Sequence, residues 1–133
     1  MRHVIVVEDD PVNATLFRTL LERRCGCRVT LTESADEAVA VAREGADAIV
    51  MDVSLRDSTY EGAPMNGVDI CRTLKRDPQT ACIPVILATA HAMRGDEEAL
   101  LEESGADDYV SKPILDLESF ARKIQRWLGE AAA

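Results

Sequence analysis

Five short apolar runs, separated by longer segments with helical spacing, constrain most strongly what this chain can fold into. The runs are rich in β-branched residues and do not alternate with polar ones, which is typical of parallel strands buried on both faces. Because a helical segment follows each run, the pattern predicts a parallel sheet covered by helices on both faces. The predicted strands span residues 4–7, 28–31, 48–51, 84–88 and 109–110.

The segments between the runs carry recognisable helix ends. Asp10 can cap a first helix that begins at Pro11, where the missing N–H costs no hydrogen bond. Ser34, followed three residues later by Glu37, is a capping box at the start of the second helix. A last helical pattern stops at Gly129, a residue type common just past a helix end. The order is therefore strand and helix, repeated five times.

Size and charge narrow the classes of function. A length of 133 residues predicts one domain spanning 1–133. A formal net charge of -9 argues against direct binding of nucleic acid, which needs clustered Lys and Arg. We find no secretory leader and no run near the ~20 apolar residues of a membrane span, so we expect a cytoplasmic protein. The cysteines lack zinc-site spacing and are expected to be reduced thiols, although the sequence CGC at 25–27 leaves a soft-metal site open.

Polar side chains that could take part in catalysis or metal binding follow four of the predicted strands. Each has an ordinary explanation when taken alone, since an Asp after a strand is commonly a helix cap, a Thr packs and a Lys is solvated. The carboxyl ends of parallel strands share one edge of a sheet, however, and ligands bind there. Three carboxylates at such an edge repel one another unless a cation lies among them, and Mg²⁺ prefers oxygen ligands. The converging residues are Glu8, Asp9, Asp52, Thr89 and Lys112.

The chemistry that suits this set is phosphoryl transfer to a carboxylate. Asp52 would attack as the nucleophile and form an acyl phosphate. Lys112 and Mg²⁺ would neutralise the phosphoryl oxygens as charge spreads over them in the transition state. Thr89 would donate a hydrogen bond to the transferred group.

Four segments resemble the hallmark segments of bacterial response-regulator receiver domains. They are VVEDD at 6–10, IVMDVSL at 49–55, ILATA at 86–90 and GADDYVSKP at 105–113, and they occur in order over nearly the whole chain. The resemblance implies a flavodoxin-like α/β fold, in which a doubly wound (βα)5 parallel sheet with strand order 2-1-3-4-5 forms the middle of three layers.

The resemblance also implies a role for each residue at the metal. Asp52 matches the phosphoacceptor and Asp9 a direct Mg²⁺ ligand. Glu8 matches an acidic position that usually contacts the metal through water. The third protein ligand would be the backbone carbonyl of Ser54.

A second group of roles concerns switching and hydrolysis. By resemblance, Thr89 and Tyr109 form a switch pair, in which the hydroxyl moves toward the phosphoryl group and the aromatic ring turns inward. On composition alone, Tyr109 is equally well explained as a strand residue half packed against the sheet. Ser54 and His91 flank the phosphoryl position and, by resemblance, tune its hydrolysis.

The resemblance further implies partners. A sensor histidine kinase or a histidine phosphotransfer protein would donate the phosphoryl group, and a downstream protein target would read the result. We expect a monomer or weak dimer that signals and is not an enzyme. Two alternatives stay open. One is a Mg²⁺-dependent phosphohydrolase of the haloacid dehalogenase type, although such enzymes have a second acid where Ser54 stands. The other is a receiver-like binding module that is never phosphorylated.

The segment 55–66 departs from the short turn that usually follows the acceptor in this family. It is polar and longer than that turn. One interpretation is a tolerated surface insertion, because loop length costs little free energy. The other is a lid or a partner contact beside Asp52.

Overall fold

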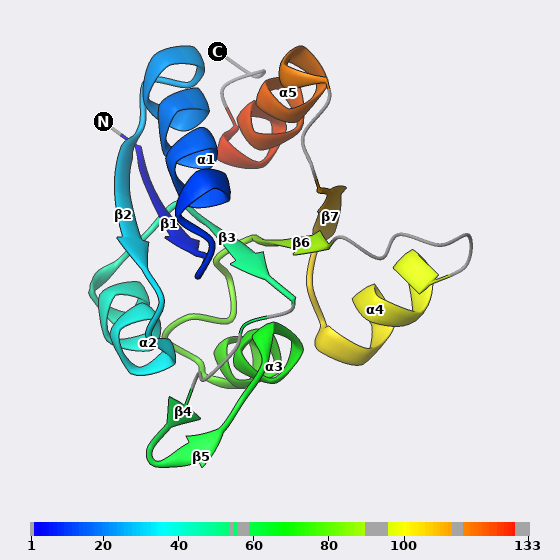
Figure 1. The fold of residues 1–133 in the computed structure, drawn as a ribbon. Coiled ribbons are helices and arrows are strands. Elements are labelled where there is room, and N and C mark those ends of the chain that lie inside the picture. Colours follow the sequence, from blue (N-terminus) through cyan, green and yellow to red (C-terminus); the bar gives the residue numbers. More distant parts are fainter. Residues whose placement is uncertain (1, 54, 56–58, 90–95, 113–115, 130–133) are drawn as a thin grey trace.

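The computed structural model describes the chain except residues 1, 54, 56–58, 90–95, 113–115 and 130–133. In the described part, five parallel strands form one sheet with the order β2-β1-β3-β6-β7 (Figure 1). These strands are the first to fifth of the predicted fold, so the flavodoxin-like order 2-1-3-4-5 is confirmed. Their bounds are β1 (His3–Val7), β2 (Arg28–Thr32), β3 (Ala48–Asp52), β6 (Val85–Thr89) and β7 (Asp108–Ser111).

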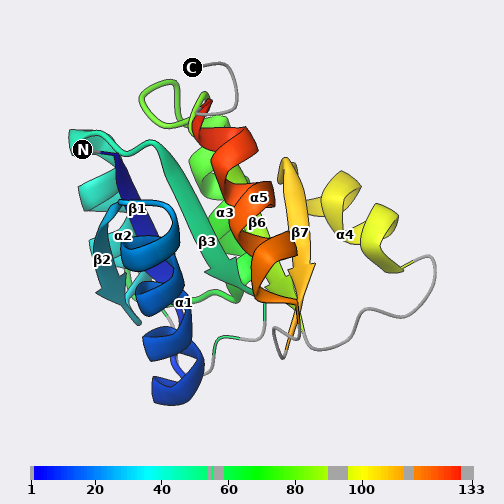
Figure 2. The same ribbon diagram turned by 90° about the horizontal axis from the view of Figure 1, so that it is seen from above.

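Helices cover both faces of the sheet, which gives the three predicted layers (Figures 1 and 2). Alternate residues of one strand enter two separate cores. In β1, Val4 and Val6 face the helices α1 and α5, whereas Ile5 and Val7 face α2 and α3. The helices are α1 (Pro11–Arg24) and α5 (Leu117–Leu128) on one face, and α2 (Ala35–Glu44), α3 (Gly67–Arg76) and α4 (Asp96–Ser104) on the other.

The ends of α1 follow from its sequence. Asp10 caps the helix as predicted, because its Oδ1 accepts a hydrogen bond of 2.9 Å from the N–H of Val12. At the other end Gly26 has a φ of 65°, and the N–H of Cys27 donates to the carbonyl of Leu21 at 3.0 Å, a common helix stop. The CGC sequence thus has a structural use, with both thiols buried in the core beneath α5.

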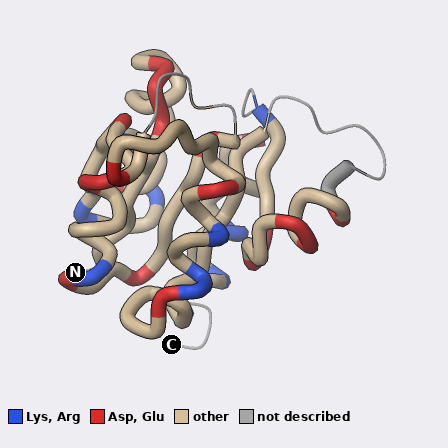
Figure 3. Tube along the Cα trace, turned by 90° about the horizontal axis from the view of Figure 1, so that it is seen from below, with Lys and Arg blue, Asp and Glu red and all other residues tan. Residues whose placement is uncertain are grey.

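Surface charge is mixed over most of the described chain, but α4 is acidic. It has no Lys or Arg, and Glu98, Glu102 and Glu103 are exposed (Figure 3). None of the described helices is long and apolar enough to cross a membrane.

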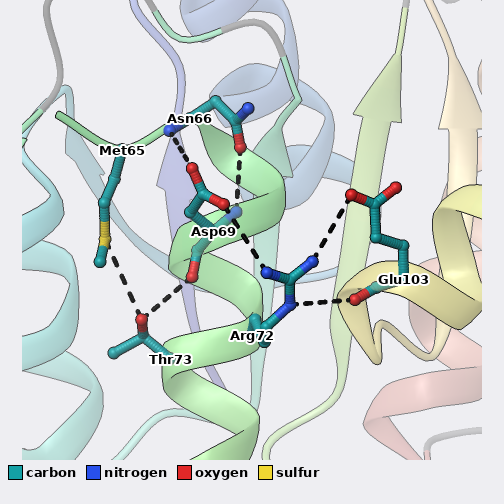
Figure 4. Close-up of polar contacts among 6 residues, drawn as sticks. All are labelled: Met65, Asn66, Asp69, Arg72, Thr73 and Glu103. Carbon is teal, nitrogen blue, oxygen red and sulfur yellow. Dashed lines mark hydrogen bonds and ion pairs between the residues drawn. The ribbon is translucent and has the colours of Figure 1, made fainter.

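Polar contacts of α3 define its start and hold it against α4 (Figure 4). Asn66 and Asp69 form a capping box, each side chain accepting from the backbone N–H of the other at 2.9 and 3.2 Å. One turn later the Nε of Arg72 donates to the backbone carbonyl of Glu103 at 3.1 Å. An arginine at this carbonyl satisfies one of the acceptors that the end of α4 leaves open.

The inserted segment holds two short strands that the sequence analysis did not predict. They are β4 (Thr59–Tyr60) and β5 (Ala63–Pro64), which pair antiparallel. The two residues between them, Glu61 and Gly62, both have positive φ, 51° and 83°, as in a type I′ turn. Figure 1 shows this hairpin beyond α2 and α3, on the side of the sheet away from α1 and α5.

The first residue of α3, Gly67, makes the closest backbone approach in this region. A Cβ added there would overlap the carbonyl oxygen of Asp52 and lie 2.9 Å from the Cα of Val53. The N–H of Gly67 also donates to the carbonyl of Val53 at 3.2 Å. The start of α3 therefore packs directly on the peptide that carries Asp52.

We expect Gly67→Ala to lower the free energy of unfolding by about 1–3 kcal/mol, because the added methyl group meets backbone atoms that must shift. Urea denaturation measures this loss. Gly26→Ala gives the cost of backbone strain alone, since Gly26 has a positive φ but open space around its Cα. A loss well below about 1 kcal/mol in Gly67→Ala would contradict the close packing at the start of α3.

Candidate functional site

Three carboxylates meet at the carboxyl edge of the sheet. Oxygen atoms of Glu8, Asp9 and Asp52 all lie within 4.8 Å of one another. Two of these side chains are buried, with Glu8 4% and Asp52 2% exposed. The meeting follows from the topology, because β1 and β3 are parallel neighbours in the sheet. Three of the predicted site residues are thus brought together.

Lys112 reaches into this group from the end of β7. Its Nζ lies 2.9 Å from Oδ1 of Asp52 and 3.1 Å from Oε1 of Glu8. Its N–H donates to the carbonyl of Thr89 at 2.8 Å, which continues the pairing of β6 and β7. The ammonium group of Lys112 therefore offsets part of the negative charge of Glu8 and Asp52.

Thr89 ends β6, the strand beside β3. It is 2% exposed, and its neighbour Ala88 is paired with Asp52 across the two strands. Thr89 is thus the next residue of β6 after the one that pairs with Asp52. The predicted position of Thr89 at the same edge as the carboxylates is therefore what the structure shows.

The electrostatics of the site depend on burial. Burial raises the pKa of Glu8 to about 7, and the hydrogen-bonded, charged Asp52 adds to the increase while Lys112 opposes it. Burial by itself would lower the pKa of Lys112, but its contacts with Asp52 and Glu8 outweigh that effect and raise it. Near neutral pH Glu8 is therefore partly protonated, and a bound cation would displace its proton.

The donor set fits a hard divalent cation. Carboxylate oxygens are the ligands of Mg²⁺ and Ca²⁺, whereas zinc sites in proteins are built mainly from Cys and His. Over the described ranges of the chain, the group of Glu8, Asp9 and Asp52 is the one set of three such side chains close enough to share an ion. Among the described residues, these three carboxylates are the group whose chemistry fits Mg²⁺.

Tyr109 lies on β7, opposite Leu87 of β6, and is half-buried. The Nζ of Lys123 sits 5.0 Å from the centre of its ring and donates to its carbonyl at 2.7 Å. The sequence analysis missed Lys123. Lys123 precedes Ile124, a buried residue of α5. No signal in the sequence, however, connects a residue of α5 to a particular residue of β7. The other predicted positions, Ser54 and His91, lie outside the described residues.

Comparisons with known proteins agree with this geometry. The family model described as "Response regulator receiver domain" matches residues 4–125. The "Polar-differentiation response regulator DivK" of Brucella ovis is 38% identical over 131 residues, which cover 98% of each chain. Among solved structures, the receiver domain of the sensor histidine kinase PA1611 from Pseudomonas aeruginosa PAO1 superposes with a TM-score of 0.80 at 33% identity, covering 96% of this chain and 98% of that one. That protein holds a magnesium ion in its active-site cleft.

Without metal, the protein should lose stability as pH rises from about 4.5 through about 7 because of Glu8. In this range the folded state still holds the proton on Glu8 that the unfolded state has released. The free energy of unfolding therefore falls as the pH rises. Glu8→Gln should flatten this slope. Urea denaturation in EDTA at several pH values measures it, and Glu44→Gln, at an exposed position of α2, is the control. A slope unchanged in Glu8→Gln would show that Glu8 does not hold this proton.

Proposed function

We propose that this chain, which belongs to the response regulator receiver domain family, accepts a phosphoryl group on Asp52 from a phosphohistidine of a sensor kinase or phosphotransfer protein. One observation carries the proposal. The carboxylate of Asp52 is 2% exposed, lies within 4.8 Å of two further acids and has a lysine Nζ at 2.9 Å. Such a carboxylate is held in position by its neighbours, with charge-neutralising groups already beside it.

Glu8, Asp9 and Asp52 would hold Mg²⁺, and the backbone carbonyl of Ser54, outside the described residues, is proposed as a further ligand. When bound, the ion would draw in the phosphoryl oxygens and offset their charge. The spacing of the three carboxylates supports this assignment. So does the magnesium ion in the cleft of the related receiver domain of PA1611.

The chain's own residues have separate tasks in the transfer. An oxygen of Asp52 attacks the phosphorus, the bond from phosphorus to the donor imidazole nitrogen breaks, and an acyl phosphate forms. During this transfer Lys112 donates to a phosphoryl oxygen, and its existing contact with Oδ1 of Asp52 means that it has little distance to move. Thr89 donates from its hydroxyl to the product.

The switch is proposed to follow from that last contact. Movement of the Thr89 hydroxyl toward the phosphoryl group leaves room for the ring of Tyr109 to turn inward. The ammonium of Lys123 now lies over that ring, so the inward turn exchanges this cation–π contact for packing beside Thr89. We propose that His91 and Ser54, both outside the described residues, tune hydrolysis of the phosphoryl group.

We expect the partners to be a histidine kinase or a phosphotransfer protein, and a downstream protein that binds the phosphorylated form. Our further expectations are a monomer or weak dimer, a cytoplasmic location and signalling without turnover of a substrate. Membership of the receiver family argues against the phosphohydrolase alternative. A binding module that is never phosphorylated is the second alternative, and labelling separates it from our proposal.

Incubation with acetyl phosphate and Mg²⁺ should add one phosphoryl group, and Asp52→Asn should abolish the gain, because an amide oxygen cannot form the acyl phosphate. Intact-protein mass spectrometry decides. Asp10→Asn is the matched control, since it removes an adjacent carboxylate while Asn caps a helix as well as Asp. Full labelling of Asp52→Asn would refute the assignment, and no labelling of the wild type would favour the binding-module alternative.

Lys112→Ala should slow labelling by acetyl phosphate by about 10²-fold, the usual effect of removing one group that stabilises transition-state charge. Lys112→Arg, which keeps the charge, should recover part of the rate. Rates come from time courses of intact mass at saturating Mg²⁺, with thermal melts to confirm folding. A rate for Lys112→Ala equal to that of the wild type would exclude Lys112 from the transfer step.

A further inference from the structure

The inserted segment after Asp52 is packed on the protein at several points. Leu55 is 8% exposed and belongs to the core that lies beneath α2 and α3. Tyr60 and Met65 pack against the same core. These apolar contacts stand at the start, middle and end of the insertion. The described part of the insertion is thus attached to the α2 and α3 side of the sheet.

The hairpin of β4 and β5 is fastened to α2 by a polar contact, and a second polar contact joins α2 to α3. At its tip, the N–H of Glu61 donates to Oδ1 of Asp36 in the first turn of α2, at 3.1 Å. Near the other end of α2, Arg43 binds Asp77, the C-cap residue of α3, with an Nε to Oδ2 distance of 2.8 Å. The hydrogen bond that Arg43 donates to Asp77, and more weakly the hydroxyl of Tyr60, raise the pKa of Arg43. Tyr60 lies on β4, the strand of the hairpin that contacts α2.

The tip conformation points to a specific docking of the hairpin. Glu61 is the one non-glycine residue with positive φ in the described chain, at 51°. Side chains other than Gly, Asn and Asp adopt this conformation at a cost, which surrounding contacts must offset. The hydrogen bond from its N–H to Asp36 is such a contact.

The far arm of the hairpin leads directly to the candidate acceptor. β5 ends at Pro64, and two residues later Asn66 caps α3. The next residue, Gly67, packs on the carbonyl of Asp52 and donates to the carbonyl of Val53. A shift of the hairpin on α2 would therefore reach the peptide of Asp52 through three residues of chain.

We infer that the hairpin is a brace: docked on α2, it holds the start of α3 against the peptide of Asp52, and Tyr60 is a positioning residue for the acceptor. The inference rests on the proposed function of Asp52. It differs from a lid or partner contact, because the tip is bonded to α2 and the hairpin lies on the side away from α1 and α5 (Figure 1). Loss of the brace should affect every phosphoryl donor alike, including small ones.

The test compares Tyr60→Ala, which removes the anchor, with Tyr60→Phe, which keeps the packing and loses the hydroxyl. Leu128→Ala is the matched control, since it truncates a buried side chain in the other core. The first readout is hydrogen exchange of the Gly67 amide by NMR in metal-free protein, relative to the amide of Val6 in β1, which lies in neither α5 nor the hairpin. The others are the Mg²⁺ dissociation constant from calorimetry and the labelling rate with acetyl phosphate.

For Tyr60→Ala we expect about tenfold faster exchange of the Gly67 amide, and Mg²⁺ binding weakened by about threefold to tenfold, as for residues that orient metal ligands. Labelling at subsaturating Mg²⁺ should slow in the same proportion. Tyr60→Phe should stay within about twofold of the wild type on all three readouts. Leu128→Ala should lower the melting temperature and leave the exchange ratio and the Mg²⁺ affinity unchanged.

Unchanged Gly67 exchange and Mg²⁺ affinity in folded Tyr60→Ala would overturn the brace, as would equal effects in Leu128→Ala. If Tyr60→Ala does not fold, Asp36→Ala replaces it, because it removes the acceptor of the Glu61 N–H and leaves the apolar anchors in place. The phosphoacceptor role fails separately, by loss of labelling in the wild type, whereas the exchange of Gly67 needs no phosphoryl group.

Discussion

Repulsion among carboxylates confined to one edge of the sheet is the interaction on which the site depends. Glu8 and Asp52 are nearly excluded from water, where the charged form of an acid is costly. The protein offsets this cost with Lys112, whose Nζ contacts both acids, and with partial protonation of Glu8 near neutral pH. A divalent cation would offset the cost further. The same surplus of negative charge therefore accounts for the lysine, the shifted pKa and the fit to Mg²⁺.

The sheet makes this arrangement possible because its central strands are packed against a core on each face. Every residue of β1, β3 and β6 is buried, so each strand end is fixed by two cores. Groups at such ends keep their positions without help from the loops that follow. The end of β3 has additional support, since Gly67 packs against the carbonyl of Asp52 and the Cα of Val53. A carboxylate that must meet a phosphorus atom in line benefits from both.

Much of this could be predicted from the sequence, because buried parallel strands leave a strong signal. Apolar runs placed the strands of the sheet, and caps such as Asp10 and Ser34 placed helix starts that the structure confirms. The roles of Asp52 and its neighbours stay predictions. The hairpin was missed because its strands have two residues each and its turn holds Glu61 in place of the usual Asn. Lys123 was missed because a contact between α5 and β7 depends on packing alone.

The contacts of Lys112 also bear on the order in which the molecule can assemble. They join residues 104 and 60 positions apart in the chain, so they belong to the slowest class of contacts to form. During synthesis the acidic residues leave the ribosome long before the lysine does. Until β7 joins the sheet, a nascent chain carries its acidic pair without this counter-charge, which disfavours a compact arrangement of those strand ends. Docking of the last strand therefore completes both the fold and the charge balance, and a truncated chain that lacks it would have neither.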